Sequence, residues 1–212
     1  KPGINDWRVK LGKEESDRIK VEGGDIGRAV HAAGLRLFKG EGYGSYEWSQ
    51  LGIPTPEDER VRNAVRGLVL MQKERELDIV GAEVFVWSQA YGYAGTMDAP
   101  VWANPERTMV DLFDWKTSSA VYPEAWLQLA AYAVAFQECY SIPVRRIYPV
   151  RLDRGLPNQR SAFYELGQTI KTLDGLTRHI PYMEGDDLMY AFETYMKAQE
   201  LGQFIKAHGG RY

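Results

Sequence analysis

Cysteine is almost absent from this sequence, since Cys139 is the only one among 212 residues. A single thiol excludes an intramolecular disulfide framework, and it excludes iron–sulfur or zinc sites that need several thiolates from this chain. Long hydrophobic runs are also missing, because no apolar stretch approaches the roughly 20 residues that a membrane-spanning helix needs. An excess of positive charge is missing too. The formal net charge is -3, so any surface that binds phosphate groups must be local.

The composition that is present is typical of a soluble globular protein. Hydrophobic residues make up 44% of the chain and charged residues 26%, which is enough apolar material for a sizeable core. The chain shows no internal repeat, low-complexity tract or clear linker. We therefore expect a single domain over residues 1–212, with its core over about 24–167 and a C-terminal helical part over about 168–212.

The N-terminal part of the chain predicts helices. Residues 4–22 have the pattern of short helices broken at Gly12, and we expect them to cap the core. Gly23–Asp25 then supplies a break and an N-cap, and an apolar stripe at helical spacing follows over Ile26–Phe38.

A glycine- and aromatic-rich loop is predicted next, over Glu41–Thr55. Its aromatic residues are Tyr43, Tyr46 and Trp48. Such rings can stack on unpaired bases, although a surface loop that packs on itself explains them better. A long helix is predicted after the loop, over Pro56–Glu76.

The most informative stretch is a predicted β-hairpin. Tyr93–Trp102 and Thr108–Trp115 are rich in aromatic and branched residues, and they flank a turn-forming run at Asn104–Arg107. If a three-residue loop closes the hairpin, paired positions sum to 212. Asp98 then lies opposite Asp114, with Cβ atoms about 5 Å apart.

Asp98 and Asp114 form an unfavourable pair on their own, because opposed like charges destabilise paired strands. Lys116 lies on the same face as Asp114, since strand side chains alternate. The two acids call for a cation between them, and hard oxygen ligands favour Mg²⁺ or Mn²⁺. We therefore predict a site for one or two such ions. For Asp114 and Lys116 alone, a solvated ion pair on a surface hairpin stays the alternative.

Two residues upstream of the hairpin are further candidates for this site. His31 lies in the predicted helix and reaches the hairpin if that helix packs across it, and neutral imidazole is a good ligand for Mn²⁺. A surface or core histidine is the alternative. Glu83 lies in a strand predicted over Ile79–Trp87, and it is a candidate for a further carboxylate that holds a water or a second metal. An exposed acid on an edge strand explains it about as well.

Elements downstream complete the expected fold. Pro123 begins a predicted helix that ends near Glu138, and Gln128 and Tyr132 are four residues apart on one face of it. A rim amide and a core phenol are the alternative explanations for these two side chains.

Further strands and helices are predicted near the C-terminus. Val144–Leu152 predicts a strand, and its interruption by Pro149 suggests a strand end or an edge strand, with Phe163–Leu166 as the expected partner. Two tail helices are predicted over Gln168–His179 and Asp186–His208.

Four motifs occur in order along the chain. They are a helical histidine in Gly27–His31, G-x-x-D at Gly95–Asp98, D-x-K at Asp114–Lys116 and Q-x-x-x-Y at Gln128–Tyr132. In this order they resemble the PD-(D/E)XK nuclease superfamily, and within it the RecB-type exonucleases. The match spans about residues 27–132. The resemblance implies an α/β fold with a restriction-endonuclease-like core, in which a mixed central β-sheet is flanked by helices, with helical elaborations at both ends.

The resemblance also implies roles for the motif residues. The side chains of His31, Asp98 and Asp114 would bind Mg²⁺ or Mn²⁺, together with the backbone carbonyl of Trp115. Lys116 would position the attacking water and offset the charge that develops on the phosphate. Gln128 and Tyr132 would orient the substrate backbone near the scissile bond. Some relatives hold an iron–sulfur cluster on four cysteines, and one cysteine excludes that subgroup.

The expected activity is therefore that of a Mg/Mn-dependent deoxyribonuclease, a phosphodiester hydrolase that acts as an exonuclease on single-stranded or frayed DNA ends. DNA repair, recombination or phage DNA processing is the expected setting. A structure-selective endonuclease of the same fold is one alternative, and a non-cleaving nucleic-acid-binding module is another. No nucleotide-binding P-loop is present in the sequence, so no helicase motor is expected within this chain.

DNA with free ends is the expected partner, with a protein partner in a repair or recombination complex as a further option and no membrane. We expect a cytoplasmic location in a bacterium or phage-infected host, and an organellar location stays open. The sequence does not predict an oligomeric state.

Overall fold

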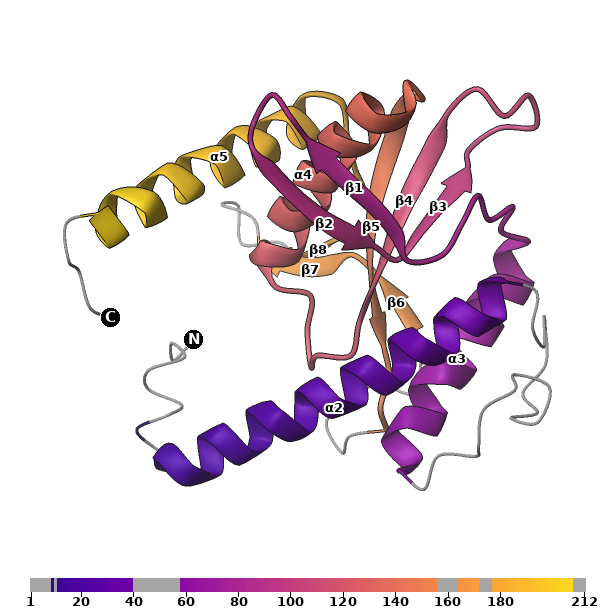
Figure 1. Ribbon diagram of the computed structural model, residues 1–212. Coiled ribbons are helices and arrows are strands. Elements are labelled where there is room, and N and C mark those ends of the chain that lie inside the picture. The colour runs from indigo at the N-terminus through magenta and orange to yellow at the C-terminus, as the bar shows by residue number, and fades with distance from the viewer. Residues whose placement is uncertain (1–8, 10, 40–57, 156–163, 172–176, 208–212) are drawn as a thin grey trace.

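A mixed sheet of five strands lies at the centre of the fold, with helices on both of its faces (Figure 1). The structure, a computed structural model, describes residues 9, 11–39, 58–155, 164–171 and 177–207, and of these it does not describe the side chains of 169–171, 177–178 and 204–207. The sheet consists of five strands: β3 (Ala99–Trp102), β4 (Val110–Lys116), β5 (Val144–Leu152), β6 (Tyr164–Leu166) and β9 (Met183–Glu184).

The pairing within this sheet is both parallel and antiparallel. β4 runs parallel to β5, whereas β3 pairs antiparallel with β4, and β6 and β9 pair antiparallel with β5. Two separate ribbons accompany the sheet, one of β1 (Val84–Ser88) with β2 (Tyr93–Met97), the other of β7 (Gln168–Lys171) with β8 (Thr177–Ile180). The prediction of a mixed α/β fold is therefore confirmed.

Alternating side chains of the sheet divide the core into two clusters. Phe113 and Trp115 of β4 pack with α2 (Lys13–Phe38) and α3 (Glu59–Arg75) on one face. Leu112 of the same strand packs with α4 (Pro123–Tyr140) and α5 (Gly185–Ala207) on the other. β4 therefore presents every second side chain to each helical layer. No helix in the described part of the chain is long and apolar enough to cross a membrane.

The helix α2 is longer than predicted. The break expected at Gly23–Asp25 is wrong, because the helix runs without interruption from Lys13. Two interior glycines cost about 1 kcal/mol each relative to alanine. Tertiary contacts on both sides of them oppose this cost, because Glu22 forms an ion pair of 2.6 Å with Arg60 of α3, and Ile26 and Val30 are buried in the core. The break expected at Gly12 is confirmed, as this residue has a φ of 81° and precedes the helix.

The other predicted helices lie close to their expected bounds. α3 begins after Asp58, whose carboxylate accepts a hydrogen bond of 2.8 Å from the backbone N–H of Arg60. α4 begins at Pro123 as predicted. The predicted loop over Glu41–Thr55, with its three aromatic rings, lies outside the described residues.

The register predicted for the hairpin is confirmed. Ala99 lies opposite Phe113, and every pair of β3 and β4 follows the same register. The turn is closed by Asn104, whose side-chain amide donates a hydrogen bond of 2.8 Å to Thr108 Oγ1. However, the strand predicted over Tyr93–Trp102 is divided in two. Its first half is β2, which pairs with β1 instead of β4.

Two predictions about the remaining strands are wrong. The strand expected over Ile79–Trp87 is shorter, because β1 begins at Val84 and Ile79 forms only an isolated bridge. β5 is a central strand, although it contains Pro149. This proline lies between the part of β5 that pairs with β9 and the part that pairs with β6, so its missing N–H falls where the neighbouring strand changes.

The first predicted tail helix, over Gln168–His179, is also wrong. Its place is taken by β7, which begins directly after Gly167, and by its partner β8. Gly167 has a φ of 71°, a conformation that glycine adopts without strain. The second predicted tail helix is confirmed as α5.

Candidate functional site

Two glycines bring α2 close to the end of β4. A Cβ on Gly27 would lie 3.6 Å from Thr117 Oγ1, and one on Gly34 would lie 3.7 Å from Trp115 Nε1. His31 lies between these glycines on the same face of the helix, since residues three and four apart are neighbours on a helix surface. The helix therefore carries His31 across the hairpin, as the sequence predicts.

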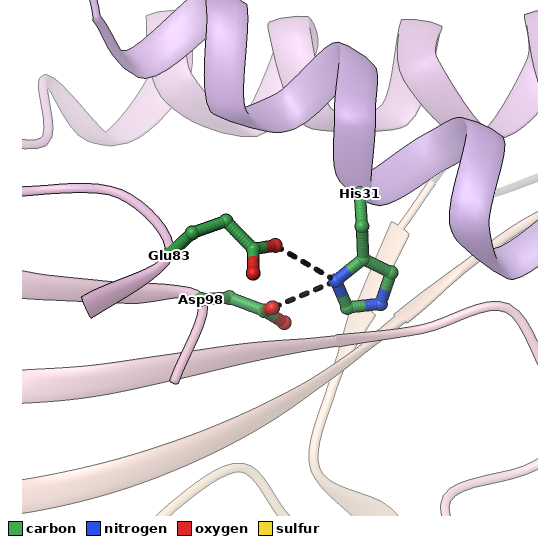
Figure 2. A group of neighbouring side chains, drawn as sticks. All are labelled: His31, Glu83 and Asp98. Carbon is green, nitrogen blue, oxygen red and sulfur yellow. Dashed lines mark ion pairs between the residues drawn. The ribbon is translucent and has the colours of Figure 1, made fainter. Parts of the chain in front are cut away.

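His31, Glu83 and Asp98 form a three-residue cluster (Figure 2). Nδ1 of His31 lies 2.7 Å from Asp98 Oδ1 and 3.4 Å from Glu83 Oε1. One potential ligand atom from each residue lies within 4.8 Å of the other two. Asp98 is buried, whereas His31 and Glu83 are each about one-third exposed. The cluster is therefore anchored on its inner side and reachable from outside.

Glu83 is not in a strand, which corrects the sequence prediction. It lies in a bend directly before β1 and has a φ of 54°. This left-handed conformation is uncommon for a residue with a side chain and costs on the order of 1 kcal/mol or more. The backbone N–H of Glu83 donates a hydrogen bond of 2.9 Å to the carbonyl of Asp98, which holds the bend beside the cluster.

Asp98 lies where β2 ends and β3 begins, and both of its carboxylate oxygens have partners. Oδ1 contacts His31, and Oδ2 accepts a hydrogen bond of 2.5 Å from the backbone N–H of Trp115. Trp115 thus contacts Asp98 through its backbone N–H. Metal binding by its carbonyl stays a prediction.

Asp114 lies beside the cluster and not within it. Its side chain is only 5% exposed, and Oδ2 lies 2.5 Å from the ammonium nitrogen of Lys116. Burial and the negative charge of Asp98 raise the pKa of Asp114, although the charges of Lys116 and His31 oppose this shift. The two aspartates are therefore close enough for the charge of one to affect the pKa of the other. The sequence analysis grouped His31 and Asp98 with Asp114, whereas the third member of the cluster in the structure is Glu83.

A chain of hydrogen bonds connects Lys116 to the helix α4. The ammonium group of Lys116 donates a hydrogen bond of 3.0 Å to Gln128 Oε1, and Gln128 Nε2 donates one of 2.9 Å to the hydroxyl of Tyr132. An ammonium can only donate, so it determines which way the Gln128 amide points. The hydroxyl of Tyr132 accepts from this amide, and its own hydrogen is available for another acceptor.

Gly95 makes room for Tyr132. A Cβ on Gly95 would lie 2.5 Å from Tyr132 Cε1 and 2.9 Å from its hydroxyl oxygen, closer than real Cβ contacts. The glycine of the G-x-x-D motif is thus needed by the tyrosine of the Q-x-x-x-Y motif. This relationship between two motifs is not visible in the sequence, in which Gly95 and Tyr132 are 37 positions apart.

The electrostatics of the site favour a cation. Burial lowers the pKa of His31, but the hydrogen bond and charge of Asp98, with the charges of Asp114 and Glu83, raise it to about 9. Burial and the charge of Asp98 also raise the pKa of Glu83. Three carboxylates and one imidazole so close together match the oxygen and nitrogen ligands that Mg²⁺ or Mn²⁺ accepts. The donor set therefore fits the predicted metal.

A cavity of about 580 Å³ adjoins the three-residue cluster. It is lined by residues of α2 and by Glu83: Gly27, Arg28, His31, Ala32, Leu35 and Glu83. Arg28 is exposed and forms an ion pair with Asp25 one turn earlier. The cavity therefore has an acidic end at the cluster and a basic residue at its rim.

Comparisons with known proteins do not assign the chain to a family. No protein-family model matches it, and no curated protein matches it either.

Proposed function

We propose that this protein is a metal-dependent deoxyribonuclease with a restriction-endonuclease-like core, which hydrolyses phosphodiester bonds as an exonuclease on single-stranded or frayed DNA ends. One observation carries the proposal: the cluster of His31, Glu83 and Asp98 adjoins the ion pair of Asp114 with Lys116. The backbone N–H of Trp115, between the two residues of that pair, joins it directly to Asp98. Metal ligands and a positioned ammonium are the groups that phosphodiester hydrolysis needs.

The cluster would hold Mg²⁺ or Mn²⁺ through His31, Glu83 and Asp98, with Asp114 beside them. The metal supplies Lewis-acid chemistry toward the phosphodiester and lowers the pKa of water at the site. His31 must lose its proton to act as a ligand, and its contact with Asp98 holds the ring in position for that role.

Lys116 is held from two sides, by Asp114 at 2.5 Å and by Gln128 at 3.0 Å. A fixed ammonium offsets the negative charge that develops on the phosphate when water attacks phosphorus, and it does so without reorganising. Tyr132 has a hydroxyl hydrogen to donate to a phosphate oxygen of the substrate. The attacking water gives its proton to solvent and the leaving oxygen takes one from solvent, so Lys116 keeps its charge throughout.

The proposal is tested with purified protein and DNA labelled at either end, single- or double-stranded, in Mg²⁺ or Mn²⁺. We expect metal-dependent release of nucleotides from DNA ends, and we expect Asp114→Asn and Lys116→Ala to abolish it. Asp78→Asn is the matched control, because Asp78 forms an exposed ion pair with Arg107 away from the site. Full activity in excess chelator, or in either site variant, would contradict the proposal.

Covalently closed single-stranded circles separate exonuclease from endonuclease action. An exonuclease leaves the circles intact, whereas their linearisation would indicate an endonuclease on the same site. DNA binding without metal-dependent cleavage would indicate a non-cleaving module instead.

A further inference from the structure

Two aromatic side chains are exposed side by side on β1. Phe85 is 56% exposed and Trp87 is 49% exposed, while Val86 between them is fully buried in the cluster with α4. The two rings are stacked, with centroids 5.9 Å apart and an angle of 28° between their planes. Large apolar side chains that gather on a surface usually mark a binding site.

Glu83 directly precedes β1 and Asp98 directly follows β2, and the hydrogen bond of 2.9 Å from the N–H of Glu83 to the carbonyl of Asp98 continues the ribbon to this pair. Two residues of the cluster therefore lie at one end of the ribbon that carries Phe85 and Trp87. The residues opposite them on β2 are Thr96 and Ala94, which are small and uncharged. The ribbon lies across α4 (Figure 1), to which Val86 is turned, so these four side chains form its outer face, and none of the four is charged.

The outer backbone edge of β1 is already occupied by α4. The thiol of Cys139 accepts a hydrogen bond of 3.3 Å from the N–H of Trp87 and donates one of 3.1 Å to its carbonyl. The hydroxyl of Tyr140 donates a hydrogen bond of 3.2 Å to the carbonyl of Phe85. A partner strand cannot add to an edge whose polar groups are engaged in this way. The exposed aromatic pair, and not this edge, is therefore the surface that β1 offers to a ligand.

We infer that Phe85 and Trp87 form a base-stacking surface for single-stranded DNA, which leads the strand to the cluster of His31, Glu83 and Asp98. This inference rests on the proposed function and names where its substrate lies. Aromatic rings stack on any base, so the surface is independent of sequence, as a nuclease that degrades DNA ends requires. A duplex keeps its bases paired and stacked within, so the surface selects unpaired strands.

The inference is tested by the binding of a fluorescein-labelled oligothymidylate, followed by fluorescence anisotropy. Ca²⁺ replaces Mg²⁺ in this measurement to slow hydrolysis. We expect Phe85→Ala and Trp87→Ala each to weaken binding at least about fivefold, because one stacked base contributes that much or more. The aromatic replacements Phe85→Tyr and Trp87→Phe should bind within twofold of the original protein. Both positions are exposed, and unchanged melting temperatures show that the variants are folded.

Tyr190→Ala is the matched control. Tyr190 is 71% exposed on α5, so it tests the loss of an exposed aromatic ring outside the ribbon, and its loss should not alter binding. Equal binding by the original protein and the Phe85→Ala/Trp87→Ala double variant would overturn the inference. Failure of the original protein to bind the oligonucleotide would also overturn it. So would a loss of self-association in the double variant with unchanged oligonucleotide binding, which would make the pair a protein interface.

The binding readout separates this inference from the proposed function. If the protein cleaves DNA but its double variant binds as tightly as the original, the proposed function stands and the stacking surface is refuted. If the protein needs both rings for binding but cleaves no DNA, the stacking surface stands and the nuclease proposal is refuted.

Discussion

The ring of Tyr132 fills the space that a side chain at position 95 would need. The tyrosine ring lies where a Cβ on Gly95 would be, with Cε1 only 2.5 Å from that point. Both residues are connected to the chemistry of the site, Tyr132 through Gln128 and Gly95 through the strand that ends at Asp98. A side chain added at position 95 must therefore act by displacing Tyr132.

Gly95→Ala should lower cleavage activity because it displaces Tyr132 from Gln128. We expect kcat/KM for DNA to fall about tenfold, as far as it falls in Tyr132→Ala, since both changes remove the same contact. The double variant should be no worse than either single variant. Gly202→Ala on α5 is the control, because a Cβ there meets no atom within 4 Å. Additive losses in the double variant would mean that Gly95 acts independently of Tyr132.

Lys116→Met should reduce both activity and stability. We expect kcat to fall about 100-fold or more, as when one preorganised charge-stabilising group is removed. The free energy of unfolding should fall by up to about 3 kcal/mol, because Asp114 is then buried without its partner. Urea unfolding in chelator measures the second effect. Asp114→Asn combined with Lys116→Met should recover part of the lost stability, and no recovery would contradict the ion-pair explanation.

His31 should make the stability of the metal-free protein depend on pH. Its pKa is raised to about 9 in the folded protein, whereas the ordinary value is about 6.5. Protonated His31 therefore stabilises the fold fully below about pH 6.5, and this contribution is lost as the pH rises through about 9. In chelator, the melting temperature of the original protein minus that of His31→Gln should decrease from pH 6 to pH 9.5. A difference that grows with pH would show that the imidazole is held neutral.

Metal should stabilise the folded protein and release protons. With Mn²⁺ at 100 times its dissociation constant, the free energy of unfolding should rise by about 2.7 kcal/mol. Calorimetry at pH 7.5 in buffers of different ionisation enthalpy should detect up to one proton released per ion, because bound His31 is neutral. Glu83→Gln should weaken Mn²⁺ binding at least tenfold, whereas Asp78→Asn should leave it unchanged. Unaltered affinity in Glu83→Gln would remove this residue from the ligand set.

The relation between Asp98 and Asp114 could be predicted because it depends on local rules. A short turn at Asn104–Thr108 determines the hairpin register, and register determines which residues lie opposite each other. The shared helical face of Gln128 and Tyr132 is equally local, because it depends only on their spacing.

The position of Glu83 depends on a second hairpin that the sequence prediction did not include. β1 pairs with β2 so that Val84 lies opposite Met97, and this register brings Glu83 beside Asp98. The signal was present in two alternating runs on either side of Gly92, whose φ of 70° suits a turn. The prediction instead joined β2 and β3 into one strand. Where a strand changes partners is decided by the rest of the fold, which local patterns do not contain.

The errors in the tail and in β5 have the same origin. Residues 168–180 contain charged and apolar types that fit a helix or two short strands, and tertiary pairing decides between them. Pro149 suggests an edge strand by a rule that assumes one neighbour along the whole strand, whereas β5 has β9 and β6 in succession on the same side.

Residue 115 serves the site and the core through different parts of itself. Its backbone N–H binds Asp98, whereas its side chain packs in the core. A main-chain donor is retained whatever non-proline side chain is attached to it, so substitutions at position 115 alter the packing beneath α2 and α3 without deleting this contact. The two faces of β4 can therefore diversify at different rates. A lineage could repack one side of the strand extensively and still position its acids in the same way on the other.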